Sequence, residues 1–220
     1  MKVHLHLPKT AGTALNFFLT KNFNVFNYGK SHILSKEEIK KIKSKKFNVL
    51  IGHISIKEII GLGIPKSNIF TILRNPIDRC ISWYYYVKKG KKIMKKKLDI
   101  KKFFNTAHHE ILKNCYNRQT YQIGDYAHVK LRNKDEKKVL ENAKKNIDKF
   151  YHVFIFENLD KGTHDKFGFI LPKKNKTKHY PKKDKISKEI IDLIIKWNKL
   201  DIELYNYIVE KKGMKDLIIQ

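Results

Sequence analysis

The chain contains little of the features that mark several special classes of protein. Of its 220 residues only Cys80 and Cys115 are cysteines, which excludes a disulfide-framed small domain and predicts a reducing compartment. The sequence has no run of about 18 apolar residues, so no membrane-spanning helix is expected. The N-terminus also lacks the apolar segment of a secretory signal. These absences predict a soluble protein, and its length fits one domain over residues 1–220.

Arginine is scarce although the chain is strongly basic. The 48 basic residues exceed the 21 acidic residues and give a formal net charge of +27, yet only four of them are arginines. Such a charge could serve a nucleic-acid or polyanion partner, but a general bias toward lysine, asparagine and isoleucine favours a solvated surface. The arginines are more informative, because Arg74 and Arg79 share one motif and Arg118 lies in another.

Short apolar runs alternate with helical patterns along the chain. The predicted strands are Val3 to Leu7, Phe47 to Ile51, Ile69 to Leu73 and His152 to Phe156. This alternation predicts an α/β fold, a P-loop-like three-layer domain whose mainly parallel sheet is flanked by helices. No internal repeat or domain boundary interrupts it.

Helical spacing predicts the elements between these strands. Helices are expected over 15–23, 36–46, 56–60, from Pro76 to about 88, over 99–106 and 108–116, and over 135–147. Ser187 is expected to cap the longest helix, which would run past Trp197 to Leu204 as one amphipathic element. The segments 90–98 and 172–186 are predicted to be exposed loops.

The turn from Pro8 to Thr13 has the composition of an anion-binding loop. It follows a strand, precedes a helix, and contains a lysine, two threonines and a glycine. Backbone N–H groups and the positive end of the helix dipole would face whatever occupies the turn. Lys9 adds a full charge, and Thr10 and Thr13 add hydroxyl donors. The turn is therefore predicted to bind a nucleotide-like anion.

Polar residues follow three of the predicted strands. Lys9 follows the first strand, His53 the second and Arg74 the third. Ligands of parallel α/β sheets bind beyond the carboxyl ends of the strands, so these side chains are expected to converge.

The first turn departs from the Walker A motif. That motif places its lysine late, directly before a serine or threonine that holds magnesium, whereas Lys9 comes first. The third strand ends in Arg74 rather than in a magnesium-binding aspartate. Both departures predict phosphate binding that requires no metal.

Two motifs in this order resemble those of sulfotransferases that use 3′-phosphoadenosine 5′-phosphosulfate (PAPS). Residues 8–13 resemble the 5′-phosphosulfate loop, and residues 74–86, Arg-Asn-Pro-Ile-Asp-Arg-Cys-Ile-Ser-Trp-Tyr-Tyr-Tyr, resemble the 3′-phosphate motif. The second motif is especially similar to that of heparan sulfate 2-O-sulfotransferase and its uronyl relatives, in which a Gly-His pair supplies the catalytic base. Gly52-His53 matches that pair.

The resemblance implies a role for each matching residue. His53 would be the general base, and Lys9 would stabilise the charge that develops on the leaving group. Arg118 would contact the acceptor. The residues implied in PAPS binding are Lys9, Thr10, Ala11, Gly12, Thr13, Ala14, Arg74, Ser82 and, in a basic loop near the C-terminus, Lys178.

The expected reaction is transfer of the sulfuryl group from PAPS to a carbohydrate hydroxyl, with an acidic glycan as the favoured acceptor. Animal 2-O-sulfotransferases are Golgi membrane proteins with a disulfide near the acceptor region. This chain has no apolar anchor, and Cys115 is expected to have no cysteine partner nearby. A soluble, cytoplasmic bacterial or viral enzyme is therefore expected. Two alternatives stay open, a P-loop-like kinase or NTPase and a basic nucleic-acid-binding module.

Overall fold

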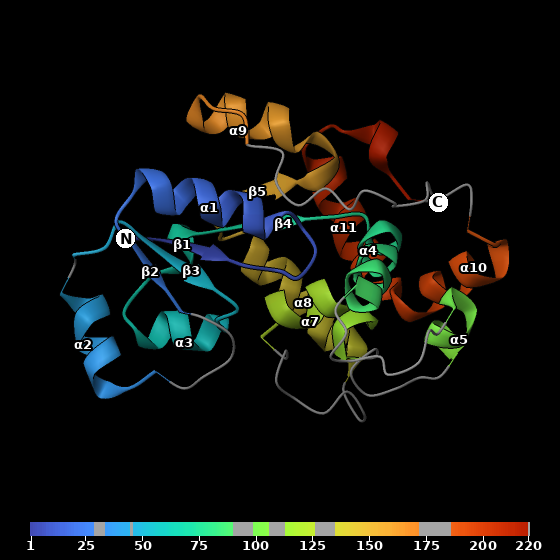
Figure 1. The fold of residues 1–220 in the computed structure, drawn as a ribbon, viewed down its shortest axis with the longest axis horizontal. Helices are drawn as coiled ribbons and strands as arrows, with labels where there is room; N and C mark the ends of the chain where they lie inside the picture. The colour runs from blue at the N-terminus through green and yellow to red at the C-terminus, as the bar shows by residue number, and fades with distance from the viewer. Residues whose placement is uncertain are drawn as a thin grey trace.

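The computed structural model describes residues 1–28, 34–44, 46–89, 99–105, 113–125, 135–171 and 186–219. These residues surround a five-stranded, all-parallel sheet in the order β2-β3-β1-β4-β5 (Figure 1). The strands are β1 Lys2–Leu5, β2 Val25–Asn27, β3 Val49–Gly52, β4 Ile69–Leu73 and β5 His152–Ile155. The helices are α1 Gly12–Asn22, α2 Lys36–Lys43, α3 Ile56–Gly61, α4 Pro76–Lys89, α5 Ile100–Asn105, α7 Arg118–Ile123, α8 Glu136–Ile147, α9 Leu159–Phe167, α10 Lys188–Trp197 and α11 Lys199–Lys211.

Alternating side chains on the buried strands attach helices to both faces of the sheet. In β3, Leu50 joins the core formed with α3, α7, α8 and α11, whereas Val49 and Ile51 pack with α1 and α9 on the opposite face. Figure 1 shows the same layers, with α1 and α9 on one side of the strands and α3, α7 and α8 on the other. The three-layer α/β fold predicted from the sequence is confirmed.

The sheet reverses its strand order between β1 and β4. From β1 the chain crosses to β2 and returns through β3, and it then passes over β1 to β4 and continues outward to β5. The chain therefore leaves neighbouring strands β1 and β4 in opposite directions. In parallel sheets such a reversal opens a crevice at the carboxyl ends of the two strands. The segments after β1 and β4 contain Lys9 and Arg74.

Several element predictions are confirmed, one is wrong, and three elements were not predicted. The helices at Lys36, Ile56 and Pro76 begin where they were expected. The helices α7 and α9 were not predicted, and neither was the edge strand β2, whose three residues are too few for a recognisable pattern. The long C-terminal helix is in fact two helices, which meet at Asn198. The predicted loop 90–98 and most of the segments 108–116 and 172–186 lie outside the described residues.

Hydrogen bonds at the start of α11 explain why the C-terminal helix is broken. The Asn198 side chain donates to the Ile194 carbonyl at 2.9 Å, which ends α10. The Asn117 side chain then accepts the N–H groups of Leu200 and Asp201 at 3.0 and 3.2 Å. A residue more than 80 positions away thus caps the new helix, and the amphipathic pattern cannot reveal it.

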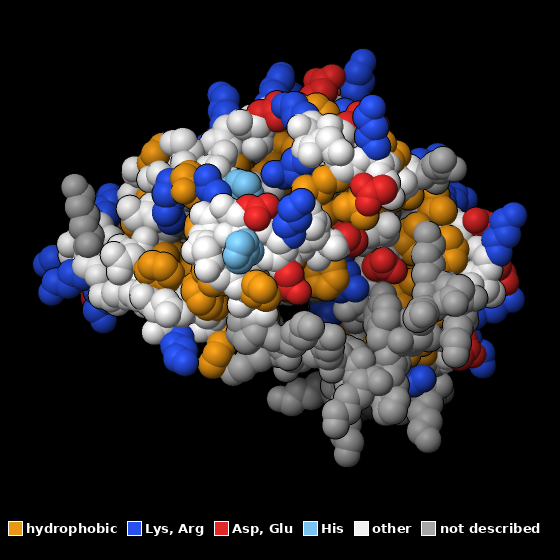
Figure 2. Space-filling view, turned by 90° about the horizontal axis from the view of Figure 1, so that it is seen from above, with side chains coloured by type: hydrophobic (Ala, Val, Ile, Leu, Met, Phe, Trp, Pro, Cys, Tyr) orange, Lys and Arg blue, Asp and Glu red, His pale blue; other side chains and the backbone are white. Residues whose placement is uncertain are grey.

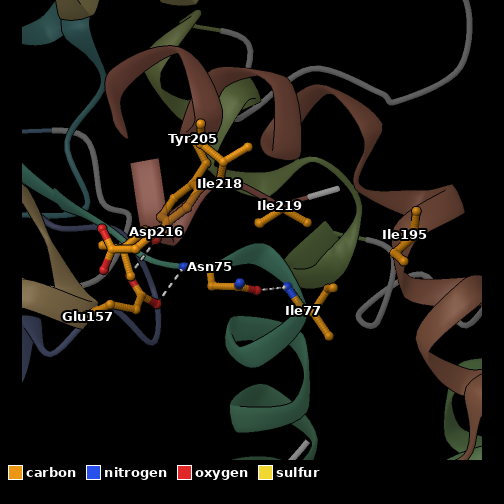
Figure 3. Close-up of a pocket in the computed structure, with 9 residues that line it drawn as sticks. Asn75, Ile77, Glu157, Ile195, Tyr205, Asp216, Ile218 and Ile219 are labelled. Carbon is orange, nitrogen blue, oxygen red and sulfur yellow. Dashed lines mark hydrogen bonds between the residues drawn. The ribbon is translucent and has the colours of Figure 1, made fainter. Parts of the chain in front are cut away.

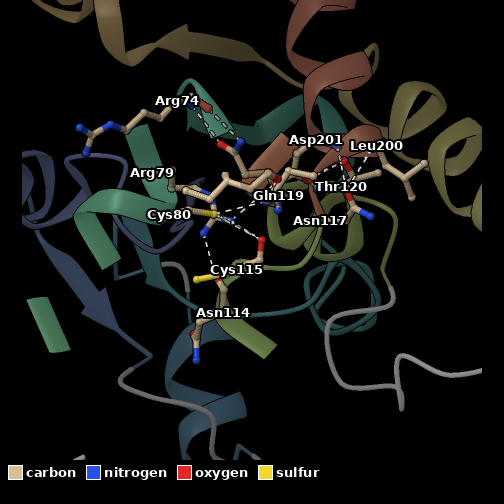
Figure 4. Close-up of polar contacts among 12 residues, drawn as sticks. Arg74, Arg79, Cys80, Asn114, Cys115, Asn117, Gln119, Thr120, Leu200 and Asp201 are labelled. Atoms are coloured by element: carbon tan, nitrogen blue, oxygen red, sulfur yellow. Dashed lines mark hydrogen bonds and ion pairs between the residues drawn. The ribbon is translucent and has the colours of Figure 1, made fainter. Parts of the chain in front are cut away.

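Asp201, near the start of α11, in turn caps the N-terminus of α7. Its carboxylate accepts the Gln119 and Thr120 N–H groups at 3.1 and 2.7 Å and the Thr120 hydroxyl at 2.8 Å. It also lies 3.7 Å from the fully buried Arg79 guanidinium. Figure 4 shows these contacts in one network, with Arg74 extending away from it.

The two cysteines lie side by side in this buried network. Cys80 Sγ is 3.5 Å from the Cys115 carbonyl oxygen, and both residues are fully buried and unbridged. The expectation that Cys115 lacks a neighbouring cysteine is therefore wrong in three dimensions. Arg79 donates to the Cys115 carbonyl at 3.3 Å and to the Asn114 carbonyl at 2.7 Å. These contacts join α4 to the segment before α7.

Among the helices that the structure describes, none combines the length and the apolar composition that a membrane crossing requires.

Candidate active site

The turn after β1 has a strained backbone. Lys9 and Ala11 have φ values of 68° and 64°, in the left-handed region that residues other than glycine rarely occupy. The buried Thr10 hydroxyl donates to the Leu7 carbonyl at 2.9 Å and ties the turn together. Its proton thus serves the turn rather than the predicted anion. Such strain gathers where a backbone must hold one conformation for a ligand.

The N-terminus of α1 lacks the side-chain caps found at α2, α3 and α8. Ser35 and Ser55 form complete capping boxes at α2 and α3, and Asp135 caps α8. At α1 the N-cap is Ala11, which has no side chain to accept a hydrogen bond, and the first turn contains no acidic residue. The positive end of the α1 dipole thus faces the turn with no carboxylate from its own first turn, an arrangement suited to an anion.

Arg74 joins the second predicted motif to this turn. Its Nη1 donates to the Lys9 carbonyl at 3.0 Å, and its guanidinium carbon lies 4.2 Å from the centre of the Phe156 ring. Its backbone N–H and carbonyl both pair with the Gln119 side chain, at 3.0 and 2.9 Å. The ends of β1, β4 and β5 therefore meet at this guanidinium.

One face of α4 extends along the same turn. The Lys9 ammonium lies 4.3 Å from the centre of the Tyr86 ring. The buried Ser82 precedes Tyr86 by one helical turn, so both residues lie on the same face of α4. This geometry places Ser82 on the face of α4 that borders Lys9, and its predicted contact with the 3′-phosphate stays a prediction.

His53 follows β3 and approaches the end of β1. Its Nδ1 lies 2.8 Å from the backbone carbonyl oxygen of His6. Because a carbonyl oxygen can only accept, the neutral ring must hold its proton on Nδ1 and its lone pair on Nε2. That tautomer is the one in which Nε2 can accept a proton from a substrate.

His4 of β1 and His6, directly after the strand, point toward α1. His4 is fully buried and hydrogen-bonds to the Asn16 side chain at 2.7 Å. Burial lowers its pKa to about 4. Burial also lowers the pKa of His6, to about 2, and the nearby charges of His4, His53 and Lys9 add to this effect. Both rings are therefore neutral at physiological pH, as scaffold histidines should be.

Helix α7 holds backbone groups of the site through two glutamine side chains. Gln119 holds the backbone of Arg74, and Gln122 donates to the His6 carbonyl at 3.2 Å. Arg118 begins this helix as a half-buried side chain, and burial together with the neighbouring Arg79 lowers its pKa to about 10. Its predicted contact with an acceptor stays a prediction. Lys178 lies outside the described residues.

A cavity of about 410 Å³ lies beside this site, past the end of β4. Figure 3 shows that the carboxylates of Glu157 and Asp216 lie close together on one side of it, while Ile77 and Ile195 belong to another side. Two carboxylates would repel a phosphate group, so this cavity is a poor match for the phosphates of a nucleotide.

The structure adds residues to the site that the sequence did not indicate. Tyr86, Phe156, Gln119 and Gln122 contact the predicted residues, and only Tyr86 could have been inferred, from its spacing to Ser82. Within the described ranges, no three His, Cys, Asp or Glu side chains form a group that could hold a metal ion.

Comparisons with known proteins extend this picture. A sequence model of the sulfotransferase family matches residues 3–208. The chain is similar in structure to the crystal structure of a sulfotransferase from Alicyclobacillus acidocaldarius, with a TM-score of 0.55, 11% sequence identity and 95% of each chain covered. At this identity the likeness concerns the fold. No curated protein matches the sequence.

Proposed function

The chain belongs to the sulfotransferase family, and on that premise we propose that it transfers the sulfuryl group of PAPS to a hydroxyl group of a carbohydrate. The observation that carries this proposal is the meeting of three predicted residues at one edge of the sheet. Arg74 contacts the carbonyl of Lys9, and His53 contacts the carbonyl of His6, three residues before Lys9. A phosphate-binding loop, a phosphate-binding arginine and a base thus lie together.

The residues of the two motifs fit the phosphates of the donor. The strained turn and the α1 N-terminus offer backbone N–H groups and a positive dipole to the 5′-phosphosulfate. Arg74 can make a bidentate contact with the 3′-phosphate, and Ser82 can add a hydroxyl donor. The residues proposed to hold PAPS are Lys9, Thr10, Ala11, Gly12, Thr13, Ala14, Arg74, Ser82 and Lys178. Thr10 would contribute its backbone N–H, because its hydroxyl donates to the Leu7 carbonyl.

In an in-line transfer, His53 and Lys9 would have different roles. PAPS supplies an activated sulfuryl group. His53 accepts the proton of the acceptor hydroxyl on Nε2 while that oxygen bonds to sulfur. The bond from sulfur to the bridging oxygen breaks, and its electron pair stays on the phosphate of adenosine 3′,5′-bisphosphate. Lys9 stabilises this negative charge where it develops.

A carbohydrate acceptor, and an acidic one in particular, is proposed from the resemblance to 2-O-sulfotransferases around Arg74 and Gly52-His53. The charge of the chain supports this choice only weakly. Figure 2 shows lysine and arginine side chains distributed around one face among acidic and apolar ones rather than gathered in a single patch. A soluble, cytoplasmic location in a bacterium or virus belongs to the same proposal.

Transfer of labelled sulfate from PAPS to a panel of acidic and neutral glycans tests the reaction. Replacement of the base in His53→Ala should lower kcat about 100-fold or more. Lys9→Ala should lower it by a similar factor, because it removes the stabilising charge. Lys21→Ala, an exposed lysine in the last turn of α1, is the matched control and should change nothing. Full activity in both active-site variants would refute the assigned roles.

Calorimetry with adenosine 3′,5′-bisphosphate separates this proposal from the two alternatives. A sulfotransferase should bind the nucleotide equally well with and without magnesium, and Arg74→Lys should weaken binding because lysine cannot make the bidentate contact. A kinase or NTPase would instead require magnesium and turn over ATP. A nucleic-acid-binding module would bind DNA or RNA in a salt-sensitive way that does not depend on Arg74.

A further inference from the structure

His6 lies between the nucleotide loop and the proposed base. Its ring stacks on that of His53, with 4.4 Å between the ring centres and 20° between the planes. Its backbone carbonyl accepts the hydrogen bond from His53 Nδ1, and its backbone N–H donates to the Gly52 carbonyl at 2.9 Å. One residue thus contacts the face of His53, its Nδ1 proton and the residue before it.

The edge of the His6 ring that carries Cδ2 and Nε2 occupies the space beside Gly12. A Cβ atom at position 12 would lie only 2.0 Å from His6 Cδ2, which is far inside van der Waals contact. Gly12 is the first residue of α1 and belongs to the loop proposed to hold the phosphosulfate. The imidazole of His6 therefore fits against the loop backbone because residue 12 has no side chain.

We propose that His6 is a positioning residue that orients His53 for proton transfer and links that orientation to the nucleotide loop. The inference rests on the proposed function, in which His53 is the base. The His6 ring fixes the plane of the His53 ring, and its carbonyl fixes the tautomer. The loop in turn fixes His6 through the close approach at Gly12.

The residues around His6 favour a flat, uncharged ring at this position, beside His53. His4 stacks on its far side at 5.6 Å, and Phe70 stacks on His4 at 5.3 Å, so four rings form one column that ends at His53. A charged ring next to a base that must gain a proton would oppose that gain. The strongly lowered pKa of His6, which burial causes, keeps its ring uncharged when His53 accepts the proton of the acceptor hydroxyl.

Substitutions of the His6 ring test whether His53 needs a flat ring beside it or an imidazole in particular. His6→Phe keeps a flat ring and the backbone carbonyl and should retain kcat within about threefold. His6→Ala removes the ring and should lower kcat about 10- to 100-fold, because misplacing a reacting group by about 1 Å has effects of that size. The KM for the acceptor should change little. His4→Phe alters the same column one ring further from His53 and should leave kcat unchanged.

The link to the loop predicts non-additive behaviour. Gly12→Ala places a methyl group where the His6 ring lies and should lower kcat by displacing that ring. In the double variant Gly12→Ala/His6→Ala the clash is gone, so its kcat should be no lower than that of His6→Ala alone. Independent, multiplying losses would overturn the link. Unchanged kcat in His6→Ala, or equal losses in His6→Phe and His6→Ala, would overturn the positioning role.

A readout without catalysis distinguishes failure of this inference from failure of the proposed function. In protein labelled with ¹⁵N-histidine, NMR should show His53 with a protected proton on Nδ1 and a lone pair on Nε2. His6→Phe should keep this signature, and His6→Ala should give averaged tautomers and rapid exchange. If no acceptor is sulfated but the signature behaves in this way, His6 still positions His53 and the assigned reaction is wrong. A fixed tautomer in His6→Ala refutes the inference whatever the activity.

Discussion

Replacement of Asp201 tests whether the buried network of Figure 4 holds the fold together. Asp201 accepts three hydrogen bonds from Gln119 and Thr120 and lies 3.7 Å from Arg79, and both charged side chains are fully buried. Asp201→Ala would leave those donors without their acceptor and the guanidinium without its counter-charge.

The size of the effect follows from burial rather than from distance. Breaking a buried ion pair by removing one partner costs about 3–5 kcal/mol, because a charge stays buried without compensation. Arg79 keeps its bonds to the Asn114 and Cys115 carbonyls, which limits the loss, whereas the donors of α7 add to it. We therefore expect the free energy of unfolding to fall by about 4 kcal/mol, a large share of the roughly 5–15 kcal/mol typical of a domain.

Glu203 provides the control two residues further along α11. It forms a shorter ion pair, 2.8 Å from Lys144, but its side chain is 57% exposed. Exposed pairs contribute about 1 kcal/mol or less, so Glu203→Ala should change the unfolding free energy only slightly. Urea unfolding followed by circular dichroism measures both variants. Equal losses in the two variants, or a loss under about 1 kcal/mol for Asp201→Ala, would refute the argument from burial.

Three further predictions concern acid stability, helix capping and thiol reactivity. His4 has a pKa of about 4 when folded and 6.5 when unfolded, so below pH 6.5 the unfolded state binds the extra proton and stability falls as the pH drops toward 4. At about 1.4 kcal/mol per pH unit, His4→Gln should reduce the loss of unfolding free energy between pH 7 and 4.5 by about 2.5 kcal/mol in urea titrations. Ser35→Ala breaks a capping box and should cost about 1 kcal/mol in the same assay, whereas Ser187→Ala removes no side-chain cap and should cost almost nothing. Cys80 and Cys115 are fully buried, so iodoacetamide should modify them only after unfolding, as mass spectrometry would show.

The helices and strands that sequence periodicity predicted are those determined by residues within the element itself. Ile69 to Leu73 is apolar and β-branched, and it forms the buried strand β4. Ser35 lies three residues before Glu38, and the two side chains form the capping box at α2. Asn198 shows the limit of such reasoning, because the signal that ends the preceding helix comes in part from Asn117, far away in the chain. Contacts of this kind leave no local pattern.

In the candidate site, too, some residues could be predicted from the local sequence, whereas the role of others depends on contacts in the folded sheet. Lys9, His53 and Arg74 were predicted because each follows a strand, and the order of the strands brings the three segments to one edge. The role of His6 could not be predicted, because alternation along β1 says only that its side chain faces away from Val3 and Leu5. Its stacking on His53 depends on the pairing of β1 with β3, which is a property of the folded sheet.

Arg74 and Arg79 illustrate why a motif cannot assign function to each of its residues. They lie five positions apart in one short segment, yet Arg79 is fully buried against Asp201 while Arg74 extends toward Lys9. Arg74 contacts the Lys9 carbonyl and the Phe156 ring beside the turn after β1. Arg79 instead faces the buried Asp201 and the carbonyls of Asn114 and Cys115. Arg74 is therefore the arginine placed beside the proposed phosphate site, and Arg79 stabilises the helix that carries Ser82.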